Sequence, residues 1–194
     1  MIIGLNGKLQ SGKDTTYGII KKLRPHAERV SFAAKLKESA AAALGIDLVT
    51  LEKFKNDEEI KYWPIKPGPE EFSAKPFTVR EYLQRVGTEA GRNVFGEDFW
   101  VDMTLPSDTK HDNKLLVVTD MRFPNEIDRV IELGGFTVRI NRFTKTNHGD
   151  HPSEQDVTNE LIDWELDNVG TIKDLRKNVA QMLLNFEEFD ADSG

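Results

Sequence analysis

The sequence predicts an α/β fold, with a parallel sheet of about five strands and helices on both faces. Short apolar segments alternate with segments of helical periodicity along most of the chain, and this order is typical of parallel strands joined by crossover helices. The run KLLVVTD (residues 114–120) is continuously apolar until its last residues, as expected for a strand buried on both faces. Polar clusters follow the predicted strands, at the sheet edge where such folds bind ligands.

The first half of the chain is predicted to contain two strands and three helices. Residues 46–77 contain several prolines and many charges, so we expect a surface excursion there with one short helix. The strands are expected at 1–6 and 28–32, and the helices at 13–24 before Pro25, at 33–44 before Gly45, and at 78–95.

The second half continues the alternation. Residues 143–160 are polar and are predicted as a loop. Strands are expected at 114–120, 136–142 and 161–168, and helices at 123–135 and from about 171 to 188.

Composition limits the classes of function. The chain has 194 residues, enough for one domain with a full core, and a net charge of −7, which argues against binding of long nucleic acids. The absence of cysteine excludes disulfides, thiolate zinc sites and a cysteine nucleophile. Apolar runs are too short to span a membrane, and the N-terminus lacks the basic start of a signal peptide. We therefore expect a cytoplasmic protein without a membrane or nucleic-acid partner.

The stretch GKLQSGK (residues 7–13) has the spacing of a phosphate-binding loop. Gly7 and Gly12 allow the backbone to curl so that the amides around Ser11 point inward. The predicted helix that follows adds the positive end of its dipole, and Lys13 would reach the β- and γ-phosphates of a nucleotide. The alternative is a glycine-rich turn with an exposed lysine.

The residues after Lys13 define the rest of this loop. Asp14 stands where such loops usually carry a hydroxyl that binds magnesium. Its carboxylate either associates with Mg²⁺ or caps the helix, and both interpretations stay open. Thr15 and Thr16 offer hydroxyls to the α- and β-phosphates.

Several stretches together resemble the phage deoxynucleoside monophosphate kinases, a branch of the P-loop kinases. They follow the family's order and cover most of the chain, although Ala33-Ala34-Lys35 departs from the family's usual Ala-Asp-Pro or Gly-Pro. The matching stretches are SGKDTT (11–16), FAAKLKE (32–38), VREYLQRVGTE (79–89), FWV (99–101), TDMRFPNE (119–126), HPSE (151–154) and DNVGTIKDL (167–175).

The resemblance implies a three-layer P-loop kinase fold and a division of labour within a single domain. Its core would comprise residues 1–32 and 112–194, its helical acceptor-binding part residues of about 33–105, and its short lid residues of about 142–158. It implies ATP as co-substrate, Mg²⁺ as cofactor and small nucleotides as partners. A homodimer stays open.

The predicted helix 78–95 has distinct faces. Arg80, Gln84 and Thr88 form a stripe four residues apart, and the resemblance places this helix over the acceptor nucleotide. We assign Arg80 to the acceptor phosphate and Gln84 to its base, and count Thr88 and Lys37 among the substrate-binding residues. The predicted core stripe is Val79, Tyr82, Leu83, Val86, Ala90 and Val94.

Two residues near this helix have alternative interpretations. Gly87 costs about 1 kcal/mol inside a helix, which close approach of a ligand would explain. Trp100 would stack on the acceptor base or belong to the core.

The stretch TDMRFPNE follows the predicted central strand. Asp120 sits where P-loop proteins keep a second metal-associated carboxylate, so Asp14 and Asp120 are the metal candidates. Asp120 and Arg122 are also counted among the substrate-binding residues. Arg122 would stabilise the transferring phosphoryl group. Glu126 is assigned to the substrate, with an Arg122–Glu126 surface pair as the alternative.

The last predicted strands complete the site. Arg142 leads into the lid and would reach the phosphates on closure, which makes Lys13, Arg122 and Arg142 the catalytic set. His148 and His151 lack the further ligands that zinc requires. Asn168 and Gly170 are assigned to the adenine of ATP through their backbone, although a simple strand-to-helix turn would use the same residues.

The leading hypothesis is phosphorylation of deoxynucleoside monophosphates by ATP for phage DNA precursor synthesis, in the host cytoplasm if a phage encodes the chain. One alternative is a P-loop kinase for another small acceptor, such as dephospho-coenzyme A. The other is a nucleotide-switched binding protein. Guanine-reading switches usually carry Asn-Lys-x-Asp, whereas residues 141–144 read Asn-Arg-Phe-Thr, which argues against a guanine switch.

Overall fold

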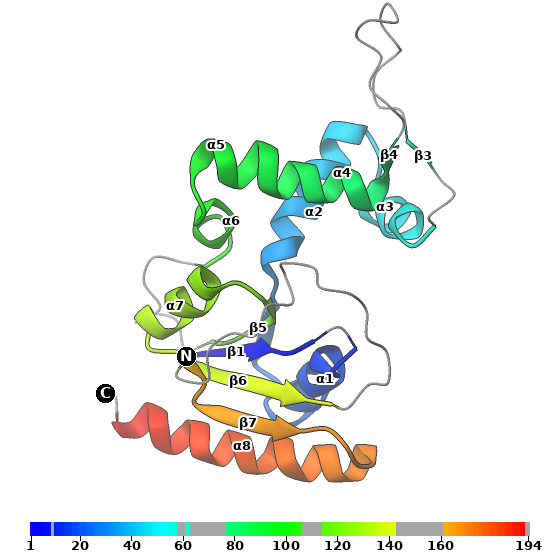
Figure 1. The fold of residues 1–194 in the computed structure, drawn as a ribbon. Coiled ribbons are helices and arrows are strands. Elements are labelled where there is room, and N and C mark those ends of the chain that lie inside the picture. Colours follow the sequence, from blue (N-terminus) through cyan, green and yellow to red (C-terminus); the bar gives the residue numbers. More distant parts are fainter. Residues whose placement is uncertain (9, 58–60, 63–76, 106–113, 143–160, 193–194) are drawn as a thin grey trace, which may run out of the picture. The chain divides into compact units, whose positions relative to one another are not determined.

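The chain folds into two units (Figure 1). The computed structural model describes residues 1–8, 10–57, 61–62, 77–105, 114–142 and 161–192. The sheet unit comprises Met1–Phe32 and Thr104–Gly194, and the helical unit comprises Ala33–Met103. Within the described residues, no helix has both the length and the apolar character needed to cross a membrane.

The sheet unit is built on five parallel strands in the order β2-β5-β1-β6-β7. All five strands predicted from the sequence are present. The second is shifted, because it ends at Val30 and the next helix already begins at Phe32. The strands are β1 (Ile2–Asn6), β2 (Ala27–Val30), β5 (Leu115–Met121), β6 (Phe136–Asn141) and β7 (Trp164–Asp167).

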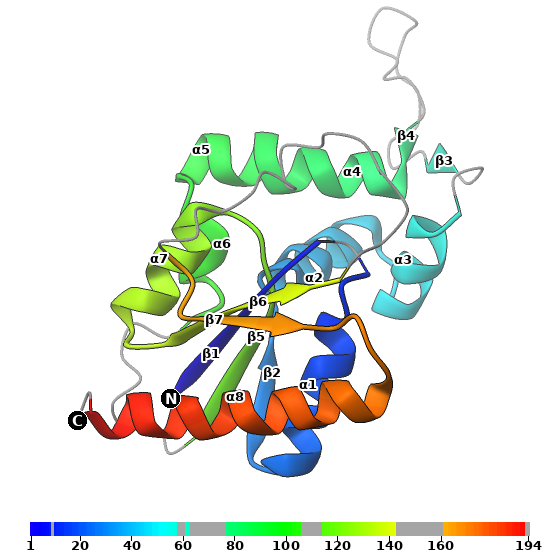
Figure 2. The same cartoon turned by 60° about the horizontal axis from the view of Figure 1, so that its bottom comes forward.

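Helices cover both faces of this sheet. α1 (Lys13–Leu23) and α8 (Ile172–Asp192) pack against one face (Figure 2), in the main hydrophobic cluster with Ile3 and Leu5 of β1. Gly4 lies between these residues and therefore faces the other way. There its Cα faces Met121 and Val130, and Val130 belongs to α7 (Pro124–Glu132). The predicted α/β fold with a parallel sheet is confirmed.

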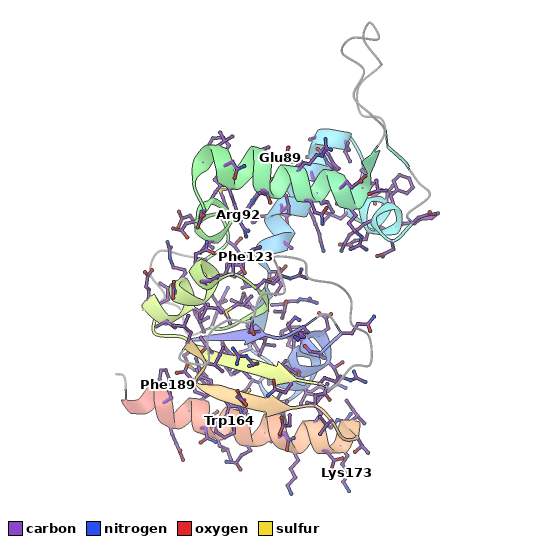
Figure 3. The ribbon with its side chains drawn as sticks, in the orientation of Figure 1. Glu89, Arg92, Phe123, Trp164, Lys173 and Phe189 are labelled. Carbon is purple, nitrogen blue, oxygen red and sulfur yellow. The ribbon has the colours of Figure 1, made fainter. Side chains whose placement is uncertain are left out.

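Aromatic side chains close one edge of the main cluster. Trp164 of β7 and Phe189 of α8 are half-buried against it (Figure 3). The rings of Phe136 and Phe189 lie 5.4 Å apart. This packing fixes the long C-terminal helix along the sheet, so that its first turn lies near the carboxyl end of β7.

The helical unit contains helices around a small apolar cluster of Ala40, Ala41, Leu51, Val79 and Leu83. Its short α3 lies in the region where one short helix was expected. The elements are α2 (Phe32–Leu44), α3 (Leu48–Lys55), α4 (Val79–Arg85), the π-helical segment η2 (Val86–Arg92), α5 (Asn93–Phe95), α6 (Phe99–Asp102), and the antiparallel pair β3 (Lys61–Tyr62) and β4 (Phe77–Thr78).

The predicted helix 78–95 forms, but its core stripe is wrong beyond Val86. Ala90 and Val94 are exposed, whereas Gly91 is buried. The reason is η2, which carries Glu89 and Arg92 (Figure 3). A π-turn holds more residues than an α-turn, so the buried face is displaced along the sequence.

Trp100 of α6 explains why η2 forms. Its indole N–H donates to the Gly87 carbonyl, with 2.9 Å between Nε1 and O. A side chain that binds a helix carbonyl disturbs the regular i→i−4 pattern. The two glycines of η2 give the room: a Cβ on Gly91 would lie 2.7 Å from Nε1 of Trp100, and one on Gly87 would lie 3.1 Å from Leu36. Packing on Leu36 is a structural reason for Gly87, and close approach of a ligand there stays a prediction.

Candidate active site

The loop between β1 and α1 has the curled backbone predicted from its glycines. Gly7 and Gly12 adopt φ angles of +148° and +106°, and Gln10 adopts +61°. A side chain at Gly7 would also collide with Ser11 Oγ and with the Ile140 carbonyl. Glycine is therefore required at both positions, for conformation and for space.

Asn168 holds this loop from the carboxyl end of β7. Its Nδ2 donates to the Ser11 carbonyl at 2.7 Å and lies against Gly12 so closely that a Cβ there would overlap it. The backbone N–H of Asn168 donates to the Asn141 carbonyl at 2.8 Å. The side-chain amide therefore shapes the loop, and the adenine contact assigned to the backbone of this turn stays a prediction.

The end of the loop offers donors that suit phosphate. Lys13 Nζ donates to the Gly7 carbonyl at 2.5 Å and to the Lys8 carbonyl at 2.9 Å, so its ammonium lies over the loop. The buried hydroxyls of Ser11 and Thr16 have no hydrogen-bond partner among the described residues, while Thr15 is exposed. Buried hydroxyls are normally satisfied, so this arrangement fits the phosphates of a nucleotide.

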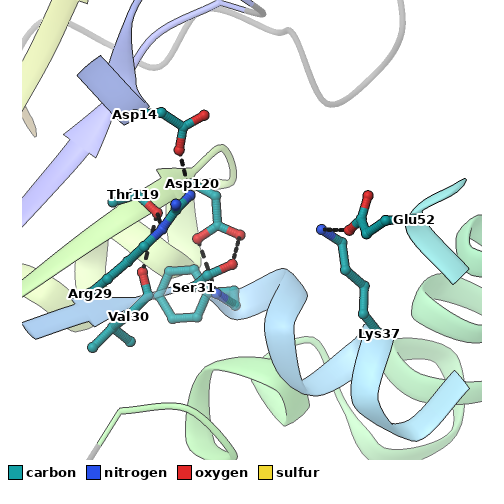
Figure 4. A network of polar contacts seen from close by, with 9 residues as sticks. Asp14, Arg29, Val30, Ser31, Lys37, Glu52, Thr119 and Asp120 are labelled. Atoms are coloured by element: carbon teal, nitrogen blue, oxygen red, sulfur yellow. Dashed lines mark hydrogen bonds and ion pairs between the residues drawn. The ribbon is translucent and has the colours of Figure 1, made fainter. Parts of the chain in front are cut away.

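The structure gives the capping interpretation of Asp14 no support, and its association with Mg²⁺ stays a prediction. Among the described residues, no side-chain hydrogen bond caps α1 at Gly12. Instead Asp14 Oδ1 accepts from Arg29 Nη2 at 2.5 Å (Figure 4). Arg29 also donates through Nε to Thr119 at 3.0 Å and lies over the ring of Tyr17. The Asp14 side chain is 78% exposed, so it fits Mg²⁺, which needs only one or two carboxylates beside water and phosphate.

Asp120 fixes the start of α2. Its Oδ2 accepts from the Ser31 hydroxyl at 2.8 Å, and its Oδ1 accepts from the Phe32 N–H at 3.0 Å (Figure 4). The N–H groups of a helix's first turn lack partners within the helix, so Asp120 satisfies one of them. The described residues contain no group of three or more metal-ligating side chains. Association of Asp120 with metal or substrate stays a prediction.

Glu126 does not occupy the place assigned to it. It is only 3% exposed, and its Oε2 accepts from the backbone N–H groups of Arg122 at 2.7 Å and Phe123 at 3.1 Å. Its carboxylate thus holds the first turn of α7. Because this burial and bonding explain the residue, we remove Glu126 from the substrate-binding set. In place of the alternative, an Arg122–Glu126 surface pair, Glu126 accepts a hydrogen bond from the Arg122 backbone.

The parallel sheet brings several predicted residues to one edge. The phosphate loop follows β1, Arg122 follows β5, and Arg142 follows β6, and these two strands flank β1. Both arginine side chains are exposed. Gly170 follows β7, and a Cβ added to Gly170 would lie 2.8 Å from Asp174 Oδ2. The rest of the predicted lid, residues 143–158, lies outside the described residues.

The helical unit holds the predicted acceptor residues. Arg80, Gln84 and Thr88 are exposed on α4 and η2. Lys37 of α2 forms an ion pair with Glu52 of α3 at 2.5 Å (Figure 4). Trp100 is 6% exposed and packs on Gly91. The structure favours its core role, and we do not keep it in the proposed substrate site.

Sequence reasoning missed three residues with chemical interest. Arg29 is a charged residue within a strand. Its position in the alternation of polar and apolar residues could have marked it as a candidate site residue. Glu52 and Lys55 lie on α3, in a segment treated as irregular. Glu52 and Lys55 stand three residues apart and form an ion pair, but this spacing gave no hint of the second partner of Glu52, because Lys37 lies on another helix.

Comparison with known proteins agrees with this geometry. The family model described as "Deoxynucleotide monophosphate kinase" matches residues 53–179. The deoxynucleoside-5′-monophosphate kinase of Escherichia phage T5 is 27% identical, over 87% of this chain and 89% of that protein. A protein of Acanthamoeba polyphaga mimivirus, provisionally named a deoxynucleotide monophosphate kinase, is 28% identical over 98% of this chain and all of its own length.

Two solved structures are similar at lower identity. Dephospho-CoA kinase from Campylobacter jejuni has a TM-score of 0.47 at 14% identity, covering 95% of this chain and 96% of that one. Shikimate kinase from Bacteroides thetaiotaomicron has a TM-score of 0.41 at 10% identity, covering 96% and 98%. At these scores the two structures add nothing to the assignment. The family match spans more than half of the sequence, and this chain belongs to the deoxynucleotide monophosphate kinase family.

Proposed function

We propose that this protein transfers the γ-phosphate of ATP to a deoxynucleoside 5′-monophosphate and forms the diphosphate. The observation that carries the proposal is the phosphate loop. Its glycines adopt the required backbone angles, its lysine lies over the curled backbone, and two of its hydroxyls are buried without partners among the described residues. Family membership supplies the acceptor class.

The reaction needs positioning more than proton transfer. An oxygen of the acceptor phosphate attacks the γ-phosphorus, and the bond from that phosphorus to the β,γ-bridging oxygen breaks, leaving ADP. The acceptor is already an anion near pH 7, so no general base is required. Lys13 would hold the β- and γ-phosphates, and Arg122 and Arg142 would stabilise the charge on the transferring group. Asp14 and Asp120 would hold Mg²⁺, whose positive charge would offset the negative charge of the phosphates.

The two units would divide the substrates. In this proposal the sheet unit binds ATP, the helical unit binds the acceptor through Arg80 and Gln84, and residues 142–158 form the lid. The product would serve DNA precursor synthesis, in the host cytoplasm if a phage encodes the chain. Exclusion of water by a closed lid would favour transfer over hydrolysis.

The test is a coupled ADP assay with a panel of acceptors. Wild-type protein is expected to phosphorylate at least one deoxynucleoside monophosphate. Lys13→Ala should lower turnover by about a hundredfold or more, because it removes the positive charge that stabilises the phosphates during transfer. Lys22→Ala is the matched control, because Lys22 is an exposed lysine at the far end of the same helix, and it should keep full turnover.

Other outcomes of the panel would overturn the proposal. If Lys13→Ala keeps the wild-type turnover, the phosphate loop does not take part in the reaction. If phosphate is transferred only to dephospho-coenzyme A, the acceptor is not a deoxynucleoside monophosphate. Nucleotide-dependent protein binding with no acceptor phosphorylated would indicate a switch instead of a kinase.

A further inference from the structure

Four charged side chains from three helices gather in the helical unit. Glu52 of α3 lies between two lysines: its Oε1 is 2.5 Å from Lys37 Nζ of α2, and its Oε2 is 3.4 Å from Lys55 Nζ of α3. The charge of Arg80, on α4, contributes to lowering the pKa of Lys55. We call Lys37, Glu52, Lys55 and Arg80 the cationic cluster.

The lysines of this cluster are unusually enclosed for surface residues. The side chains of Lys37 and Lys55 are only 27% and 26% exposed. Burial, the charge of Lys37 and the charge of Arg80 lower the pKa of Lys55, against the opposing effect of Glu52. Burial also raises the pKa of Glu52, but the two lysines outweigh it and the net shift is downward. Glu52 is therefore an anion shared by two cations.

The cluster has a surplus of positive charge. It contains three cations and one anion, and Arg80 forms no ion pair within the part of the chain that the structure describes. Arg80 is exposed, but Lys37 and Lys55 are partly buried, and burying an incompletely compensated charge is unfavourable. A surplus of two charges matches a phosphate monoester, which carries nearly two negative charges near pH 7.

We propose that Lys55 is a further substrate-binding residue, which contacts the 5′-phosphate of the acceptor together with Lys37 and Arg80, and that Glu52 is a positioning residue that holds the two lysines together. An ammonium group has three N–H donors. Each lysine can therefore keep Glu52 and still donate to a phosphate oxygen. This inference rests on the proposed function, because it takes a nucleoside monophosphate as the ligand.

The first experiment compares Lys55→Met with Lys53→Met. Lys53 lies on the same helix and is exposed, so it controls for the loss of a lysine from α3. Lys55→Met should raise the KM for the deoxynucleoside monophosphate about tenfold, as expected for a lost charge-assisted hydrogen bond, and leave the KM for ATP unchanged. Lys53→Met should change neither constant. Lys55→Arg, which keeps the charge, should retain most of the affinity.

A binding measurement isolates the phosphate. Calorimetry should show that Lys55→Met loses affinity for the deoxynucleoside monophosphate but binds the corresponding deoxynucleoside, which lacks the phosphate, as the wild type does. Equal losses for both ligands would overturn the proposal, since Lys55 would then act on the nucleoside or on the fold.

Glu52→Gln tests the positioning role. It should raise the KM for the monophosphate at nearly constant kcat, and this effect should disappear in the Lys55→Met background, because the lysine to be positioned is gone. A lower KM in Glu52→Gln would show that Glu52 competes with the phosphate and would contradict the role. If Lys55→Met keeps the wild-type KM, this inference fails while the kinase stands. If the wild type phosphorylates no monophosphate, the proposed function itself fails.

Discussion

Single hydrogen bonds from remote residues shape the phosphate loop. The loop lies near the N-terminus, yet Asn168, on the last strand-to-helix turn, supplies the bond to Ser11 that closes its curve. Lys13 bonds back to the loop's own carbonyls and so lies across it. The loop is thus held from β7 as well as from β1 and α1.

Asn168→Ala is expected to weaken ATP binding selectively. Loss of one hydrogen bond costs about 1 kcal/mol, so the KM for ATP should rise several-fold, while the KM for the acceptor stays constant in steady-state assays. Asn178→Ala is the control, because Asn178 donates a comparable bond to the Asp167 carbonyl at 3.0 Å without touching the loop. Equal effects of both variants on ATP would contradict the role of Asn168.

Residue types alone located the loop but not all of its contacts. Gly7, Gly12 and Lys13 were predictable, since their spacing is dictated by the local curl of the backbone. Glu126 was misassigned, because a carboxylate that caps a helix and one that binds a ligand look alike in sequence. Lys55 was missed, because the other two cations of its cluster, Lys37 and Arg80, lie on other helices.

At the scale of elements, the strands were more predictable than the long helix. The three central strands β1, β5 and β6 are short apolar runs whose burial follows from composition. The outer strands β2 and β7 are more polar, and their place in the strand–helix alternation predicted them. The register of the helix from Val79 to Phe95 depends on Trp100 of another helix. Periodicity within the helix's own sequence therefore misplaced the face beyond Val86.

Two glycine variants test this packing. Gly91→Ala should destabilise the protein, because the new Cβ would lie within 2.9 Å of three atoms of the buried Trp100 ring. Gly18→Ala in α1 should stabilise it by roughly 1 kcal/mol, because nothing lies within 4 Å of its Cβ position and alanine favours a helix. Urea denaturation measures both. A stabilised Gly91→Ala protein would contradict the described contact with Trp100.

The start of α8 gives a pH-dependent contribution to stability. Hydrogen bonds from the Thr171 side chain and backbone lower the pKa of Asp174 below its ordinary value. A carboxyl with a lowered folded pKa stabilises the protein above its unfolded pKa of about 3.9, and loses this effect as the pH falls through the folded value.

Asp174→Asn should therefore reduce the melting temperature near pH 7 and have a smaller effect as the pH falls through the lowered pKa of Asp174 in the folded protein. Thermal denaturation across this range measures the difference. If the difference in melting temperature between the wild type and Asp174→Asn does not shrink as the pH falls, the charge of Asp174 does not account for its stabilising effect.

At the scale of the whole molecule, the sheet unit is assembled from both ends of the chain. The helical unit is inserted after Phe32, and the chain returns to the sheet unit at Thr104. This insertion was inferable only through family resemblance, because no composition break marks residue 103 or 104. The roles of the two units in binding ATP and acceptor remain predictions that the acceptor panel and the Lys55 variants address.

The strand order has a consequence for biosynthesis. β1 and β2 are consecutive in the sheet unit's sequence but do not pair, because β5 lies between them. While the ribosome has released only the residues up to Met103, neither strand has met its neighbour. We expect amides of β1 and β2 in a fragment ending at Met103 to exchange hydrogen rapidly, and protection of β1 there would contradict this dependence. The nascent chain must therefore keep its phosphate loop unformed until more than half of the polypeptide has emerged.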